Sequence, residues 1–184
     1  EGGEPPQIEL AALAGQTEGL LLLTGGPQGP VGRLLAEGQA PAAEAMLDRL
    51  AALFPGRLYV ELMRHGLTVE DRIEGALVDL AYRHDLPLVA TNDIYFADAG
   101  FYEAHDALLC IAEGTVVGAP NRRRLTPEHH FKSPAAMRAL FADLPEACDN
   151  TLVIARRCAF MVGKIKPILP PYPTQSGRNE EEEV

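Results

Sequence analysis

Short apolar runs alternate with longer amphipathic stretches in the first half of the chain. The runs are rich in β-forming residues, which is typical of buried parallel strands; they cover residues 19–26, 57–63 and 86–93. The stretches between and around them carry apolar positions at helical spacing; they cover residues 30–37, 41–54 and 69–84. Strands and helices therefore alternate, which predicts an α/β fold class with β-α-β units and a parallel sheet.

The third predicted helix has clear end signals. Thr68 is the expected N-cap, acidic residues follow it in the first turn, and Arg83 and His84 in the last turn complement the helix dipole. Three consecutive strands fit either a doubly wound sheet or part of a barrel. Neither a GxGxxG nor a P-loop pattern follows any strand, which argues against a nucleotide-binding fold.

The second half of the chain is predicted to be mostly helical. A helix over residues 99–114 has an apolar side that consists of Phe101, His105, Leu108, Leu109 and Ala112. Ser133 is the expected cap of a helix over residues 134–144, and another helix covers residues 145–158. From Ala159 onwards the many prolines predict an extended connector.

The composition limits the classes of function. The formal net charge is −10, and such an acidic surface is a poor match for the phosphates of nucleic acid. The three cysteines show no CxxC spacing, so we expect reduced thiols in a cytoplasmic protein. No apolar run reaches the ~18 residues of a membrane span, so no membrane partner is expected. The arbitrary start and the end rich in proline, glycine and acids lead us to expect a piece of a larger protein.

Polar side chains follow the predicted strands at their carboxyl ends. Asp93 is the best single candidate, either as a metal ligand or general base, or as a cap of the following turn. Glu61 lies within the second strand, and His65 follows it, so both would share this rim with Asp93 if the strands are parallel. The three side chains are candidates for a divalent metal site, and structural ion pairs at the rim are the open alternative.

The remaining polar candidates also have two explanations each. His105 faces the apolar side of its helix and is expected to be a core histidine with its hydrogen bonds satisfied. His129 and His130 are sequence neighbours that diverge on regular structure, so we expect exposed side chains and no ligand pair. The basic run Asn121–Leu125 either contacts a phosphate or is a solvated loop that balances the acidic surface. No Ser-His-Asp or Cys-His pattern stands out.

Four segments of the chain resemble the bacterial DNA polymerase III alpha subunits, the replicative family C polymerases. They follow one another in the family's order and read YVELMRHG, LPLVATND, EAHDALLCIAEG and FKSPAAMRALFADLPEACDNTLVIARRC. The resemblance implies that residues 1–160 are the later part of a PHP (polymerase and histidinol phosphatase) domain, whose parallel strands belong to a distorted seven-stranded β/α barrel. It implies that residues 161–184 are a connector towards the polymerase palm with a disordered acidic tail.

PHP domains with an intact site hold a cluster of zinc or manganese ions at the strand ends. The resemblance aligns the family's Asp-x-His motif with Asp93-Ile94-Tyr95 and places Gly26 where the family has a cysteine. Losing two ligands should strongly weaken metal binding, since single defects around a metal already cost about 10–100-fold. Gly26, Asp93 and Tyr95 are therefore expected to be vestigial metal-site positions with no metal bound, and the Tyr95 hydroxyl is expected to bond to Asp93.

The resemblance also implies a role for the whole polypeptide. It would be a DNA-directed DNA polymerase that uses Mg²⁺ held by palm aspartates outside this chain, so no catalytic residue is assigned here. The PHP region would be a scaffold that docks the proofreading exonuclease subunit and other replicase subunits, while other domains contact DNA. The alternative is an active metal-dependent phosphoesterase or 3'-5' exonuclease that binds Zn²⁺ or Mn²⁺ through Asp93, upstream histidines, and Glu61 or His65. A domain whose resemblance is incidental is the third hypothesis.

Overall fold

The three predicted strands form one parallel sheet. The computed structural model of the chain describes residues 8–165, and its strands are β1 (Leu22–Leu23), β2 (Leu58–Leu62) and β3 (Leu88–Ala90). They lie in the order β1-β2-β3, with Leu22 opposite Leu58 and Glu61 opposite Val89. The predicted α/β class and the parallel β-α-β order are confirmed, although β1 is much shorter than the apolar run that predicted it.

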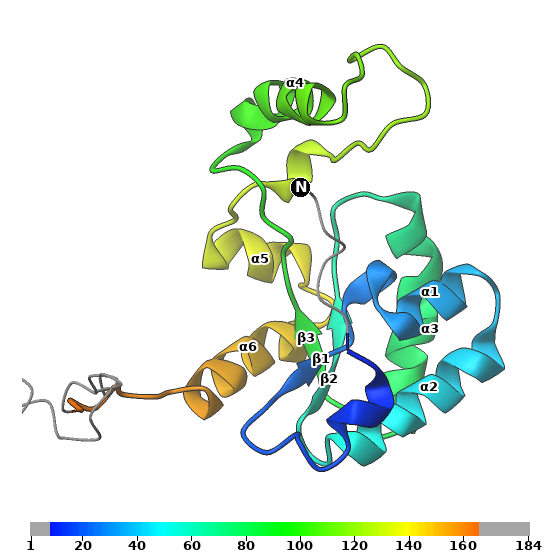
Figure 1. Ribbon diagram of the computed structural model, residues 1–184, viewed down its shortest axis with the longest axis vertical. Helices are drawn as coiled ribbons and strands as arrows, with labels where there is room; N and C mark the ends of the chain where they lie inside the picture. The colour runs from blue at the N-terminus through cyan, green and yellow to red at the C-terminus, as the bar shows by residue number, and fades with distance from the viewer. Residues whose placement is uncertain (1–7, 166–184) are drawn as a thin grey trace, which may run out of the picture.

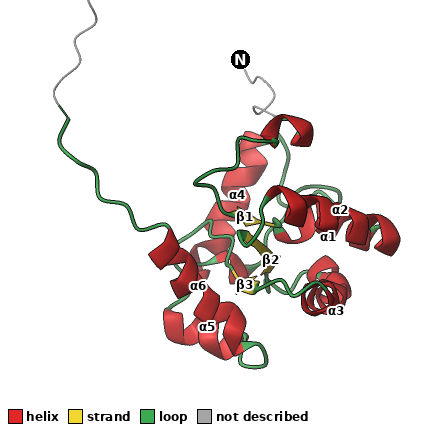
Figure 2. Cartoon of the chain, turned by 90° about the horizontal axis from the view of Figure 1, so that it is seen from below, coloured by secondary structure: helices red, strands yellow, loops and turns green. Residues whose placement is uncertain are grey.

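Four helices pack against this sheet through one hydrophobic cluster. They are α1 (Pro30–Ala36), α2 (Ala40–Leu53), α3 (Thr68–Arg83) and α6 (Pro145–Arg157). The first three lie together beside β1 and β2, and α6 packs along β3 (Figures 1 and 2). The largest fully buried side chains of the cluster are Phe141, Leu47, Leu58, Leu62, Ile73 and Leu88. Each fully buried side chain of this size contributes about 1.5–3 kcal/mol relative to an exposed one, so this cluster is the main source of stability.

Alternate residues of the strands point to opposite faces of the sheet. Leu58, Val60 and Leu62 of β2 belong to the cluster beneath the helices. Tyr59 and Glu61 are buried as well but lie outside that cluster, because successive side chains of a strand point in opposite directions. One face of β2 therefore carries Leu58, Val60 and Leu62, and the opposite face carries Tyr59 and Glu61.

The start of α3 differs from the prediction. Thr68 is the first residue inside the helix, and the preceding Leu67 has the extended conformation of an N-cap. The carboxylate of Glu70 accepts a hydrogen bond from the Leu67 backbone N–H at 3.2 Å. Glu70 thereby satisfies a free backbone donor at the helix start, and the prediction that Thr68 is the cap is wrong.

Helix α4 (Tyr102–Ala112) is oriented differently from the expected core helix. It follows a 3-10 turn at Ala99–Phe101 and stands apart from the sheet, at the top of Figure 1. Its buried residues are Asp106 and Cys110, whereas Leu108 from the predicted apolar side is 61% exposed. The side chain of Arg122 packs against the helix and pairs with Asp106, so a charged pair takes the place of an apolar contact.

The end of the described chain agrees with the sequence. Helix α5 (Pro134–Leu140) begins after Ser133, whose side chain accepts a hydrogen bond from the Ala136 N–H at 3.2 Å, as predicted. Residues 159–165 contain neither helix nor strand, and the predicted acidic tail lies outside the described residues. Within residues 8–165, no helix combines the length and the apolar character that crossing a membrane requires.

Candidate functional site

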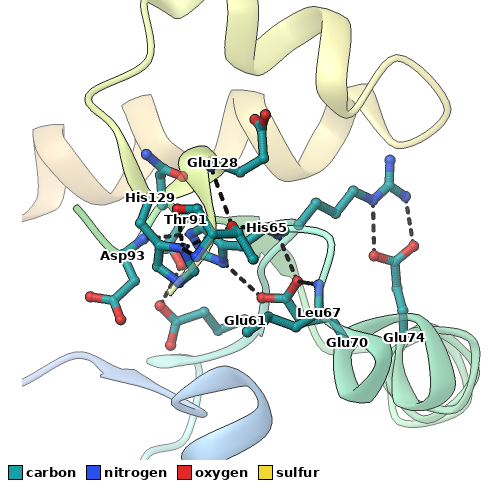
Figure 3. Close-up of polar contacts among 12 residues, drawn as sticks. Glu61, His65, Leu67, Glu70, Glu74, Thr91, Asp93, Glu128 and His129 are labelled. Atoms are coloured by element: carbon teal, nitrogen blue, oxygen red, sulfur yellow. Dashed lines mark hydrogen bonds and ion pairs between the residues drawn. The ribbon is translucent and has the colours of Figure 1, made fainter. Parts of the chain in front are cut away.

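The carboxyl ends of the strands surround a pocket of about 250 Å³. Its lining includes Gly25 after β1, Met63 and His65 after β2, and Asp93 after β3. A fifth residue, His129, comes from the 3-10 turn Pro127–His129 (Figure 3). The structure thus brings the predicted rim residues His65 and Asp93 together, because parallel strands end at one edge of the sheet.

Glu61 joins the ends of all three strands. Its side chain is buried, and its carboxylate accepts hydrogen bonds from the Gly25 N–H at 2.8 Å and from the Thr91 hydroxyl at 2.6 Å. Its own backbone N–H donates to the hydroxyl of Thr24 at 2.9 Å. Both carboxylate oxygens are therefore used inside the sheet, which fits the structural alternative for this residue.

His65 is held by a hydrogen bond at each ring nitrogen. The residue is fully buried, and its Nδ1 donates to Glu70 Oε1 at 2.7 Å. Its Nε2 accepts from the Asp93 backbone N–H at 3.1 Å, which fixes the tautomer that carries the proton on Nδ1 (Figure 3). Because the lone pair of Nε2 is already engaged, this imidazole has no free atom for a metal.

Glu70 is the hydrogen-bond partner of both the ring and the backbone of His65. Its second oxygen accepts from the His65 backbone N–H at 2.6 Å and from Leu67 at 3.2 Å. Burial acts to raise the pKa of Glu70, but the hydrogen bonds from the His65 side chain and from both backbone groups outweigh it, so the pKa lies below its ordinary value. The carboxylate is thus kept ionised beneath the pocket.

His129 is a site residue that the sequence did not reveal. It is buried rather than exposed, and its ring stacks on that of His65 with 4.1 Å between centroids and 17° between planes. Its Nδ1 lies 3.2 Å from the Thr126 backbone N–H, while the Thr126 hydroxyl donates to the His65 carbonyl at 2.6 Å. The expectation that His129 is solvent-exposed is wrong. Thr126 followed by Pro127 is a sequence signal for the start of a turn, but it does not indicate that the turn packs against His65.

The burial of His129 predicts a pH dependence of folding. Burial first, and the neighbouring His65 second, lower the pKa of His129 below its ordinary value of 6.5. Below pH 6.5 the unfolded chain takes up a proton that the folded chain refuses, so the free energy of unfolding should fall on acidification, by at most about 1.4 kcal/mol per pH unit. Urea unfolding between about pH 7 and pH 5 measures this slope. It should flatten in His129→Gln but not in the neighbouring control His130→Gln, and an unchanged slope in His129→Gln would refute the assignment.

Asp93 keeps a free carboxylate. The side chain is half-buried at the pocket, and within residues 8–165 its oxygens accept no hydrogen bond. The alternative in which this carboxylate caps the following turn is therefore not realised. Asp93 is the one predicted metal-site position in the pocket whose ligand atoms are unoccupied by described residues.

Tyr95 does not contact Asp93 as expected. Its hydroxyl accepts a hydrogen bond from Arg123 Nη2 at 2.9 Å, and its ring is 37% exposed. The ring edge approaches His129 with 5.9 Å between centroids and His105 with 5.6 Å. The prediction of a hydrogen bond to Asp93 is wrong, because the Tyr95 hydroxyl is bonded to the guanidinium of Arg123 instead.

Met63 covers the position where the family has a cysteine. Gly26 is buried with φ +51°, a left-handed conformation that favours glycine. A Cβ atom at Gly26 would meet Met63 Sδ at 3.0 Å, so the methionine side chain must move before any larger residue fits. Gly26 therefore offers no ligand, and the Met63 side chain packs beside it.

Two further expectations need correction. His105 is half-buried, but its Nδ1 is buried without a hydrogen-bond partner in the described chain, so it is not a satisfied core histidine. Arg122 of the basic run is not solvated: its guanidinium donates to both oxygens of Asp106 at 2.5 and 2.6 Å, and the side chains are 3% and 9% exposed. This ion pair also lowers the pKa of Asp106.

The residues present do not fit a metal cluster of the PHP type. Within the described part of the chain, no group of three or more His, Cys, Asp or Glu side chains is placed to hold a metal ion. Among the expected positions, Gly26 has no donor, Tyr95 is bonded to a cationic guanidinium, and His65 uses both nitrogens internally. Of these positions, only Asp93 has a side-chain donor that no residue in the range 8–165 engages.

Comparison with known proteins shows two similarities. The PHP domain family model matches residues 1–65. The chain is 59% identical over 179 residues to the DNA polymerase III subunit alpha of Caulobacter vibrioides, an alignment that covers 97% of this chain and 16% of that protein. Over almost its whole length, the chain is similar to a segment of the DNA polymerase III alpha subunits. The predicted resemblance is confirmed, and the hypothesis that it is incidental is wrong.

Alpha subunits from other bacteria match the same stretch. The subunit from Pseudomonas aeruginosa is 42% identical over 161 residues, which is 87% of this chain and 14% of that protein. The subunit from Escherichia coli K12 is 38% identical over 174 residues, which is 94% of this chain and 15% of that protein. The chain thus spans about one sixth of the length of the alpha subunits that it matches.

Proposed function

We propose that the chain is the later part of the PHP domain of a polypeptide that synthesises DNA, and that its local role is structural. Its relatives are named DNA polymerase III subunit alpha, and the PHP domain model matches residues 1–65. The complete polypeptide would extend a primer with deoxynucleoside triphosphates and Mg²⁺ ions held by palm residues outside this chain. It would act in the cytoplasm, on the chromosome.

The arrangement of strands and helices supports the barrel part of this proposal. The described strands keep their sequence order, and α1, α2, α3 and α6 pack through one hydrophobic cluster. A β/α barrel keeps its strands in sequence order, whereas a doubly wound sheet reverses that order. In the seven-stranded barrel that we propose, the face with Glu61 would point inwards, and the PHP region would extend to about residue 160.

One observation carries the scaffold role: the internal bonding of His65. A histidine that binds a metal needs a free nitrogen, but both nitrogens of His65 are bonded within the fold, at 2.7 Å to Glu70 and 3.1 Å to the Asp93 backbone. A metal at Nε2 would displace the Asp93 backbone N–H and leave this donor without its partner. The same pocket that would hold metals in an intact PHP domain therefore works better as a hydrogen-bonded joint between strand ends.

A scaffold of this kind would also present surfaces to other proteins. We propose that the proofreading exonuclease subunit and other replicase subunits dock on the PHP region, while DNA is bound by other domains. The formal net charge of −10 supports protein partners over nucleic acid, because an acidic surface repels phosphates.

The alternative, an active metal-dependent phosphoesterase or 3'-5' exonuclease, has one observation in its favour. Asp93 leaves a free carboxylate at a pocket of about 250 Å³, and a carboxylate is a suitable ligand for Zn²⁺ or Mn²⁺. In this alternative the remaining ligands would come from outside the chain.

The metal content of the complete, purified polypeptide tests the two roles. We expect less than about one tenth of a zinc, manganese or iron ion per chain after dialysis against a weak chelator, measured by elemental mass spectrometry, because the ligand set here is incomplete. A stoichiometric, tightly held metal would contradict the scaffold role. In that case Asp93→Asn should abolish both the bound metal and the nuclease activity, with Asp98→Asn, which lies outside the pocket lining, as the control.

A further inference from the structure

Helix α4 turns an apolar stripe towards solvent. Phe101, Leu108 and Ile111 follow one another at helical spacing and are 55%, 61% and 76% exposed. In the next loop, Val116 and Val117 are 68% and 54% exposed. Single exposed apolar residues are ordinary, but several large ones on one side of a helix mark an interaction surface.

The opposite side of α4 explains why the stripe cannot turn inwards. Asp106 and Cys110 are buried there, and the guanidinium of Arg122 donates two hydrogen bonds to the carboxylate of Asp106. The same guanidinium donates to the Val117 carbonyl at 3.1 Å and so fixes the loop beside the helix. Rotating α4 to bury its apolar stripe would expose this pair and break these bonds, so the orientation of the helix is built into the fold.

Two arginines lie in the same unit with no acidic partner. Arg123 and Arg124 are exposed, yet within residues 8–165 neither forms an ion pair, in a chain whose formal net charge is −10. Arg123 is instead held by the Tyr95 hydroxyl, and Arg124 donates to the carbonyls of Val117 and Ala119 at 3.1 and 3.2 Å. Neutral acceptors thus fix the positions of both guanidinium groups and leave their charges uncompensated. A partner surface with carboxylates at the facing positions would compensate them.

We infer that this surface, the α4 face (Phe101, Leu108, Ile111, Val116, Arg123 and Arg124), is an intramolecular interface covered by another domain of the same polypeptide. The covering surface is apolar at its centre and carries Asp or Glu side chains opposite the two arginines. The inference rests on the proposed function, in which the polypeptide has the length of its relatives; about five sixths of those proteins lie outside the matched segment. The aliphatic character of Leu108, Ile111 and Val116 favours a protein surface over nucleic acid, whose bases stack on aromatic rings.

Labelling of an engineered cysteine in the complete alpha subunit tests the inference. The variant is Ile111→Cys, at the most exposed position of the stripe, and the reference is Arg72→Cys at an exposed position on α3. With the subunit alone, we expect maleimide to modify position 111 at least about tenfold more slowly than position 72, as peptide mass spectrometry resolves, because a docked domain must open first. Both positions should react at similar rates in urea.

Rapid labelling of position 111 in the subunit alone overturns the inference. Protection that appears only after a second replicase subunit or primed DNA is added overturns it too, in favour of that partner.

A charge-reversal pair gives a second readout: Arg123→Glu with Arg124→Glu should restore labelling at position 111 in the protected subunit, and persistent protection would contradict the predicted acidic contacts. Primer extension by the Ile111→Cys subunit separates the two claims. If the subunit extends primers while position 111 is open, the inference fails and the proposed function stands; if the unsubstituted subunit does not extend primers, the proposed function fails.

Discussion

Replacing Arg64 by methionine is expected to lower the free energy of unfolding of the chain by about 3 kcal/mol. Arg64 follows β2, and all its guanidinium nitrogens donate: Nε and Nη2 to Glu74 on α3, and Nη1 and Nη2 to Asp143 between α5 and α6, at 2.7–2.8 Å. Nη1 also donates to the Leu140 carbonyl at 2.6 Å, and the guanidinium lies 4.5 Å from the ring centroid of the fully buried Phe141. One side chain therefore connects the sheet, α3 and the C-terminal helices.

The size of this effect follows from burial. The Arg64 side chain is 20% exposed and Glu74 is 24% exposed, so their bond is only weakly screened, whereas Asp143 is 64% exposed and adds little. Urea unfolding followed by circular dichroism measures the change, since the chain has no tryptophan for fluorescence. The matched control is Arg138→Met, which removes an ion pair with Asp149. The side chain of Arg138 is 50% exposed and that of Asp149 is 63% exposed, so this substitution should cost less than about 1 kcal/mol. Equal losses in the two variants would show that Arg64 is an ordinary surface residue.

Local patterns were sufficient to predict most of the fold. The strand runs and the helical spacing placed β2, β3 and every helix from α1 to α6 near their observed positions, because both signals depend only on neighbouring residues. The gathering of Glu61, His65 and Asp93 was also predictable, since the carboxyl ends of parallel strands share an edge. The position of the pocket therefore follows from the sequence alone.

The chemistry of that pocket was not predictable, because it depends on contacts between residues far apart in the chain. Nothing near His129 indicates that its ring will stack on His65, and nothing near Tyr95 indicates that Arg123 will take its hydroxyl. The orientation of α4 has the same cause. Its own spacing suggests a core helix, whereas contacts with residues outside the helix, such as the ion pair between Arg122 and Asp106, decide which side is buried.

Replacing Glu70 by alanine is expected to cost about 3 kcal/mol of unfolding free energy. The Glu70 carboxylate is buried and accepts from the His65 ring at 2.7 Å, from the His65 backbone at 2.6 Å and from the Leu67 backbone at 3.2 Å. Alanine would leave these donors without a partner, and a buried donor without a partner costs about 1–3 kcal/mol. Glu70→Gln keeps one acceptor oxygen at the same place and should recover part of the loss. Urea unfolding of the three proteins at pH 7 measures both differences.

The same residue also sets the acid limit of the fold. The folded pKa of Glu70 is lowered from its ordinary value of 4.5, so its stabilisation is fully present above that value and is lost as the pH falls through the folded pKa. Between about pH 5 and pH 3 the unfolding free energy of the unsubstituted chain should therefore fall more steeply than that of Glu70→Gln. Glu37→Gln, at an exposed carboxylate that accepts only from the Gln39 side chain, is the control and should follow the unsubstituted chain. If Glu70→Gln kept the full acid slope, the joint between His65 and α3 would be held by contacts other than this carboxylate, and the scaffold role assigned to the pocket would lose its main support.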